Sequence, residues 1–185
     1  MIKIKNLSEI THNELLSFGI IQFTSNSKYK VIREESEDEI EFNLKLTRHP
    51  EFLVGAGYND KNELEKYNRI MKEGNSFGAY EDDKLIGFVI AEKREWNNSL
   101  RVEMIRVAKD HKRKGIGTLL LNELEKHTRS VNVRLIDIET QNTNVPAIDF
   151  YRKNGYEFAG LNMTLYDPEE VGEDIAVFLS KSIKY

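Results

Sequence analysis

The residue types best suited to binding a ligand gather between His111 and Thr118, where three cationic side chains stand directly before two closely spaced glycines. Because glycine has no Cβ atom, the backbone at such a position can approach a ligand closely. If a helix starts here, its first N–H groups have no intrahelical partner, and the positive end of the helix dipole lies behind them. This combination predicts an anion-binding site of the kind that holds phosphate groups. Its residues would be Lys112, Arg113, Lys114, Gly115, Gly117 and Thr118.

The elements needed to position this site can be predicted from the hydrophobic pattern. Apolar residues recur at helical intervals after the first glycine, which predicts a helix over about residues 115–129 with one apolar face. They are Ile116, Leu119, Leu120 and Leu124. Upstream, apolar runs at residues 77–80, 85–91 and 100–107 predict three antiparallel strands joined by turns. Taken alone, residues 111–118 could be an ordinary glycine turn with solvated lysines. The predicted helix after them and the strands before them favour the anion site.

The rest of the chain is predicted to form short strands and helices. Residues 28–33 and 39–47 alternate, so both are expected to be strands, the second ended by Pro50. One short helix ends before Gly74, and another begins at Pro146, where a first helical turn tolerates proline. Further strands are expected at residues 131–138, 156–165 and 175–179. The predicted fold is α+β, with layers around a mixed, mostly antiparallel sheet.

Length and composition limit the classes of protein to consider. The 185 residues fit a single domain spanning residues 1–185. The chain has no cysteine and its four histidines are scattered, so neither a thiolate nucleophile nor a metal site is expected. A net charge of −4 argues against a general nucleic-acid binder. No apolar run approaches the roughly 20 residues that span a bilayer, and the first residues lack the apolar core of a secretory signal, so a cytoplasmic protein is predicted.

Two spaced motifs point to one enzyme family. The first covers residues 112–117, and the second covers residues 144–156 and contains Phe150 and Tyr151. With the strands and helices around them, they resemble the GCN5-related N-acetyltransferase (GNAT) family. The family pattern begins with Gln or Arg where this chain has Lys112, a position that acts largely through its backbone and positive charge. The resemblance implies a GNAT-like sheet in which a splayed strand pair binds acetyl-CoA.

The resemblance also implies which residues bind acetyl-CoA. Backbone N–H groups of residues 112–118 would hold the pyrophosphate, and the cationic side chains there would attract it. Ile105 and Val107 would lie along the pantetheine arm, which pairs with their strand. A backbone N–H of that strand would polarise the thioester carbonyl. Asn144 would contact the arm from the other side.

The implied reaction is direct acetyl transfer to a primary amine without a covalent enzyme intermediate, and the absence of cysteine agrees with it. Glu103 is the candidate base that takes a proton from the amine, and Glu139 is the alternative. Glu103 could instead be a strand carboxylate paired with Arg101 or Arg106. Tyr151 matches the general acid of the family, which donates a proton to the departing CoA thiolate, and it could instead be a core aromatic.

A narrower resemblance is to streptothricin acetyltransferases, and it implies a small cationic amine as substrate. Trp96 and Glu139 would bind this substrate. The acidic run at residues 34–41 would either line an opening for it or form a solvated edge or loop. Met104 departs from the resemblance, because an acid is expected there. The residues that carry the resemblance include Trp96-Asn97, Val102-Glu103, Glu139-Thr140-Gln141 and Met163-Thr164-Leu165-Tyr166.

Other functions stay open at this point. The acceptor could be a protein, a peptide or a polyamine, or the chain could be a non-catalytic sensor that binds acetyl-CoA. A sensor would keep the anion site without needing Tyr151 or Glu103, so their presence favours catalysis. A monomer and a homodimer are both compatible with the sequence.

Overall fold

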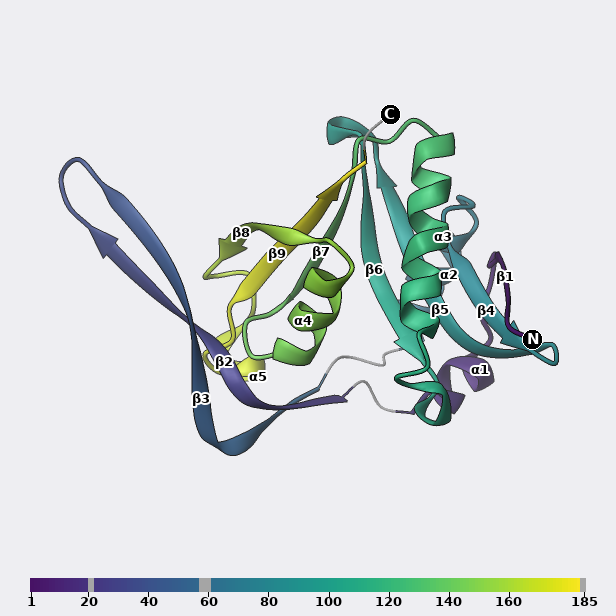
Figure 1. Cartoon of the computed structure of the whole chain (residues 1–185), viewed down its shortest axis with the longest axis horizontal. Helices are drawn as coiled ribbons and strands as arrows, with labels where there is room; N and C mark the ends of the chain where they lie inside the picture. The colour runs from purple at the N-terminus through teal and green to yellow at the C-terminus, as the bar shows by residue number, and fades with distance from the viewer. Residues whose placement is uncertain (20–21, 57–60, 184–185) are drawn as a thin grey trace. The chain divides into compact units, whose positions relative to one another are not determined.

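The computed structural model describes residues 1–19, 22–56 and 61–183 (Figure 1). The chain divides into two compact units. The first consists of Met1–Ile21, Tyr58–Ile138 and Ser180–Tyr185, and the second of Gln22–Gly57 and Glu139–Leu179. The single domain spanning residues 1–185 stays a prediction. In the described part of the chain, no helix is both long and apolar enough to cross a membrane.

A mixed sheet forms the centre of the first unit. Its strands lie in the order β1 (Lys3–Asn6), β4 (Phe77–Glu81), β5 (Lys84–Arg94), β6 (Ser99–Val107) and β7 (Leu135–Gln141), and β7 then continues into the second unit. Neighbouring strands are antiparallel except β6 and β7, which run parallel. The predicted α+β class and the three antiparallel strands before the anion site are confirmed.

Helices cover both faces of this sheet. On one face lie α1 (His12–Ser17) and α2 (Lys61–Met71), and Phe18 at the end of α1 meets Phe88 of β5 edge-on at a ring distance of 4.9 Å. On the other face, α3 (Ile116–Ser130) crosses β4 and β5. Side chains of a strand alternate between its faces. Phe88 therefore belongs to the α1–α2 core, whereas its neighbour Gly87 lies against α3.

The second unit contains a long two-stranded ribbon. Its strands β2 (Gln22–Glu35) and β3 (Ile40–Ala56) are antiparallel. The unit also holds the end of β7 and most of β9. In this part of the sheet the strand order is β7-β9-β8. Its remaining elements are α4 (Val145–Lys153), β8 (Glu157–Asn162), α5 (Pro168–Val171) and β9 (Ala176–Ser182).

Predicted boundaries are wrong at several strand ends. β2 begins at Gln22 and not at residue 28, and β8 ends at Asn162 and not at residue 165. Pro50 does not end its strand, because β3 continues to Ala56. The proline falls between Arg48 and Leu53, where the ladder to β2 is interrupted and a missing N–H is tolerated. The strand expected from residue 131 begins at Leu135, because the preceding residues form the turn that follows α3.

Candidate active site

The predicted anion site lies at the start of α3, in the first unit. A short 3-10 turn, η2 (Lys109–His111), leads into it, and Gly115 is the N-cap residue with φ of 81°. Gly115 has no side chain to cap the helix, so the first N–H groups of α3 point out of its end. A Cβ atom at Gly115 would meet nothing within 4 Å, and the side chains of Lys112, Arg113 and Lys114 are exposed. This end of α3 therefore combines outward N–H groups, open space and positive charge.

Close packing of α3 on the sheet holds this site in place. Ile116 is buried, and a Cβ atom at Gly87 of β5 would meet its Cγ2 atom at 3.0 Å. Gly87 therefore lets the helix approach the strand. Before the helix, His111 Nε2 lies 3.1 Å from the carboxylate of Glu81 in β4. The first turn of α3 also contains Gly117 and Thr118.

A β-bulge shapes the strand that leads to the anion site. Two consecutive residues of β5 pair with Met104 and Val102 of β6, so Glu103 is the extra residue. Such a residue bends and twists its strand. The parallel ladder to β7 reaches Val102, whereas β6 continues beyond it. Ile105 and Val107, which are expected to lie along the pantetheine arm, belong to this continuation of β6.

Glu103 is an ion-paired carboxylate on the α2 side of the sheet. Its oxygens lie 2.7 Å from Lys66 Nζ and 3.8 Å from Arg94 Nη2. The two arginines expected as partners make other contacts. Arg101 pairs with a β7 carboxylate at 3.1 Å, and Arg106 donates hydrogen bonds to the carbonyls that follow α1. The expected partners are therefore wrong, and the role of Glu103 as base stays a prediction.

The carboxylate of Glu103 also acts on a nearby phenol, that of Tyr67, which was not among the predicted site residues. Tyr67 of α2 is buried. Burial, followed by the negative charges of Glu63 and Glu103, raises the pKa of Tyr67. Tyr67 is therefore a neutral phenol beside the candidate base throughout the physiological pH range.

In the second unit, Tyr151 lies in α4 and is buried. Its ring centroid is 5.3 Å from that of Phe150 and 6.0 Å from that of Tyr156, so it belongs to an aromatic group. Burial, and then the negative charge of Glu139, raises the pKa of Tyr151. The phenol is therefore held in its protonated form, which is the form that a general acid requires.

The other predicted residues are spread over both units. Asn144 is the N-cap of α4, and its side chain accepts a hydrogen bond from a first-turn N–H at 3.3 Å. Glu139 of β7 accepts a hydrogen bond from the Tyr166 hydroxyl. Trp96 lies in the 3-10 turn η1 (Glu95–Asn97) between β5 and β6 and is 83% exposed. Trp96 and the anion site therefore belong to the first unit, and Asn144 and Glu139 to the second.

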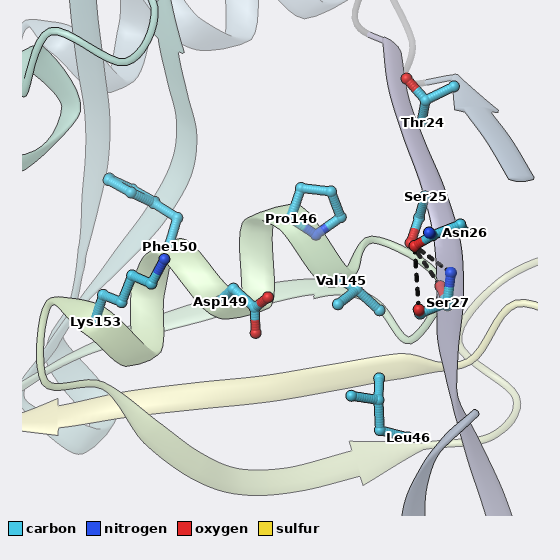
Figure 2. A pocket seen from close by; sticks show the side chains of 10 residues that line it. All are labelled: Thr24, Ser25, Asn26, Ser27, Leu46, Val145, Pro146, Asp149, Phe150 and Lys153. Atoms are coloured by element: carbon cyan, nitrogen blue, oxygen red, sulfur yellow. Dashed lines mark hydrogen bonds between the residues drawn. The ribbon is translucent and has the colours of Figure 1, made fainter. Parts of the chain in front are cut away.

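A pocket of about 600 Å³ in the second unit was not predicted from the sequence (Figure 2). On one side β2 contributes hydroxyl and amide side chains, and on the other α4 contributes Asp149, Phe150 and Lys153. Ser25 Oγ donates to the carbonyl of Ser27 at 2.6 Å and accepts from its N–H at 3.1 Å, which fixes the polar wall. The one sequence signal was the polar run at residues 24–27. The pocket is also lined by Thr24, Asn26, Leu46, Val145 and Pro146.

Comparison with known proteins finds streptothricin acetyltransferases among the relatives of this chain. Streptothricin acetyltransferase from Streptomyces lavendulae is 34% identical over 99 residues, which cover 54% of this chain and 52% of the relative. The chain thus matches about half the length of that curated relative. The crystal structure of nourseothricin acetyltransferase covers 99% of both chains, with a TM-score of 0.76 and 25% identity.

A second solved structure shares the fold. It is a Bacillus anthracis str. Ames protein that carries the streptothricin acetyltransferase name and was solved in complex with acetyl coenzyme A. It covers 98% of this chain and 99% of its own, with a TM-score of 0.71 and 24% identity. The profile of the Acetyltransferase (GNAT) family matches residues 29–156, which is more than half of the chain. The anion site at the start of α3 and the bulged strand β6 lie inside that match, and the chain belongs to the Acetyltransferase (GNAT) family.

Proposed function

We propose that this chain is an acetyl-CoA-dependent N-acetyltransferase of the cytoplasm. It moves an acetyl group directly to a primary amine of a small cationic molecule, and a streptothricin-type antibiotic is the proposed acceptor. The observation that carries this proposal is the likeness to nourseothricin acetyltransferase over 99% of both chains. That likeness includes the ribbon β2–β3 and the C-terminal elements, and so extends beyond the segment matched by the family profile.

The residues at the start of α3 fit a donor that carries a pyrophosphate. Outward N–H groups and open space beside Gly115 suit phosphate oxygens, and Lys112, Arg113 and Lys114 supply attraction. Thr118 would add its hydroxyl. Acetyl-CoA supplies the activated acetyl group as a thioester.

The continuation of β6 beyond its ladder to β7 would hold the pantetheine arm. Ile105 and Val107 lie in this part of the strand, and their backbone groups would pair with the amides of the arm. A backbone N–H beside the bulge would donate to the thioester carbonyl and polarise it. Asn144 would contact the arm through the side-chain atoms that its capping bond leaves available.

Two ionisable residues would move the protons of the reaction. An alkyl ammonium has a pKa of about 10.4, so the amine must lose a proton before it attacks. Glu103 would accept this proton, directly or through water, and Glu139 is the alternative base. Tyr151 would donate a proton to the departing thiolate, because its phenol is held protonated.

The pocket beside α4 would bind the polar part of the acceptor. Asp149 offers a carboxylate for an ammonium group, and the β2 wall offers hydroxyl and amide groups for hydrogen bonds (Figure 2). Phe150 lines the pocket and directly precedes Tyr151 in α4. Trp96 and Glu139 remain the acceptor contacts predicted from the sequence.

Replacing Asp149 by Asn tests the acceptor pocket. Because the substitution removes a charge-assisted hydrogen bond, it should raise the KM for the cationic acceptor roughly tenfold and leave the KM for acetyl-CoA unchanged. Steady-state kinetics with each substrate varied in turn would measure both. Glu157→Gln removes the same charge from exposed β8 outside the pocket and should change neither constant. Equal effects of the two substitutions would reject Asp149 as an acceptor contact.

A panel of acceptors tests the proposed activity. The purified chain and acetyl-CoA would be mixed with streptothricin, an aminoglycoside, spermidine and a peptide with a free α-amine, and release of the CoA thiol followed. The highest kcat/KM is expected for streptothricin. A preference for the peptide or for spermidine would assign the chain to the alternative acceptor classes. Tight acetyl-CoA binding without turnover of any amine would identify a sensor.

A further inference from the structure

The ribbon of the second unit exposes a row of large apolar side chains on one face. Ile40, Phe42 and Leu46 of β3 are 56%, 46% and 52% exposed, and Leu44 between them is half-buried. Alternate residues of a strand share a face, so these four form one continuous row. The residues opposite them on β2 are Glu35, Arg33, Val31 and Tyr29. The other face of the ribbon is mostly polar: it carries Lys30, Asn43 and Lys45, and its one large apolar residue in this stretch is Ile32, opposite Asn43.

Among the described residues of the second unit, contacts with other elements cover the base of this apolar face. Tyr29 is buried, its ring lies 5.4 Å from that of Phe158, and its N–H donates to the carbonyl of Asn142 at 2.9 Å. Farther out, among the described residues, the hydrogen bonds and ion pairs of residues 30–45 stay within the ribbon. A two-stranded ribbon is marginally stable by itself. Its outer half therefore gains most from a partner that covers the apolar row.

Charges on the ribbon suggest what covers it. The turn at its tip carries Glu37, Asp38 and Glu39, all exposed. At the base, Arg48 pairs with Ser27 and lies on the same face as the apolar row, two residues beyond Leu46. Along β3 this face thus has an acidic end, an apolar middle and a basic end, while Arg33 and Glu35 beside it on β2 are paired with each other. A surface with this order is complementary to itself when one copy is reversed.

We propose that the ribbon face binds the same face of a second copy of this chain, with the two ribbons antiparallel. A two-fold axis level with residue 43 would place the row of one β3 against the row of the other. Leu44 would then pack on the partner's Phe42, and Leu46 on the partner's Ile40. Arg48 would meet the partner's acidic tip, so both ends of the interface gain opposite charges.

In this register, dimerisation would also change the surroundings of the pocket. Leu46 and Ser27 line the pocket, and Arg48 is the register partner of Ser27. The acidic tip of the partner would therefore lie beside the pocket mouth and add negative charge there. The proposal stands without the enzyme activity, because the apolar row and the charges are independent of any reaction.

Molecular mass in solution tests the interface. Light scattering after size-exclusion chromatography should show a dimer for the full chain. Phe42→Lys places a charge in the apolar row and should shift the chain to a monomer at the same concentration. Asn43→Lys adds the same charge one residue later on the polar face and should leave the dimer intact. A monomeric wild-type chain at all concentrations, or a Phe42→Lys dimer as stable as wild type, would overturn the proposal.

Cysteine pairs test the antiparallel register. The chain has no cysteine, so Asp38→Cys together with Arg48→Cys introduces the only thiols. Within one ribbon these positions are roughly 30 Å apart, too far for a disulfide. Oxidation should give a covalent dimer that a reductant reverses, and either single substitution should give much less. If the chain is dimeric but this cross-link does not form, the register is rejected. If the chain is monomeric and binds lipid vesicles through this face, the face is assigned to a membrane.

Discussion

At the scale of single residues, the hydroxyl of Tyr151 carries the most specific catalytic prediction. Tyr151→Phe keeps the buried ring and removes the proposed acid, so kcat should fall roughly 100-fold or more while both KM values change little. Steady-state kinetics measure this split. Tyr156→Phe removes a neighbouring buried hydroxyl and should keep kcat close to wild type. Similar losses in both variants would indicate a packing effect and not an acid.

The pKa of the same phenol predicts how stability depends on pH. Burial and Glu139 raise the pKa of Tyr151 above its ordinary value, which is about 10. Above that pH the folded chain keeps a proton that the unfolded chain loses. The contribution to stability is therefore complete below about pH 10 and declines as the pH rises further. Urea unfolding at a series of alkaline pH values would show a smaller decline for Tyr151→Phe, and an unchanged decline would assign it to other phenols such as Tyr67.

Residues within local motifs were predictable, and their distant partners were not. Gly115 was recognisable because closely spaced glycines just before a helical hydrophobic pattern indicate a helix start with an accessible backbone. Glu103 was recognisable as a candidate base by resemblance, yet its partner Lys66 is 37 positions away. That contact depends on how α2 packs against β6, and neither segment contains a local signal for it. A sequence pattern therefore locates chemistry better than it locates ion pairs.

At the scale of elements, the start of α3 gives a prediction for Gly115. Its φ of 81° costs a residue with a Cβ atom roughly 1 to 2 kcal/mol, so Gly115→Ala should lower the free energy of unfolding by about that amount. Affinity for acetyl-CoA should also fall, because the first N–H groups of α3 would be reoriented. Chemical unfolding and titration calorimetry measure the two effects.

A matched glycine in β8 is the control for this substitution. Gly160 also has nothing within 4 Å of an added Cβ atom, and its φ is not in the left-handed region. Gly160→Ala should therefore change neither stability nor acetyl-CoA affinity appreciably. A Gly115→Ala variant that is less stable but binds acetyl-CoA as wild type does would show that the anion lies elsewhere.

Elements with a clear hydrophobic period were predicted well, whereas a short helix was missed. The helix expected over residues 115–129 corresponds to α3, although Leu119 is 43% exposed and Leu121 is buried in its place. The buried face of α3 is wider than the predicted stripe and reaches Leu121 and Glu125. α1 was not predicted, even though Thr11 and Glu14 form a capping box there. Six residues are too few for a helical period to emerge.

At the scale of the whole molecule, the α+β class followed from the sequence, but the division into two units did not. Each unit is assembled from segments that are far apart in the chain, such as Gln22–Gly57 with Glu139–Leu179 in the second. A boundary of this kind needs no linker rich in proline or glycine, so composition does not reveal it. The parallel pairing of β6 with β7 is equally non-local, because α3 lies between them in sequence.

The central claim is that an acetyl group passes directly from acetyl-CoA to an amine of a streptothricin-type molecule. Mass spectrometry of a reaction containing the chain, acetyl-CoA and streptothricin tests it most directly, because it reads the masses of acceptor and protein together. Streptothricin should gain one acetyl group only when the chain is present, and the protein mass should stay unchanged. An unmodified streptothricin, or an acetylated protein that passes its acetyl group on, would contradict the account.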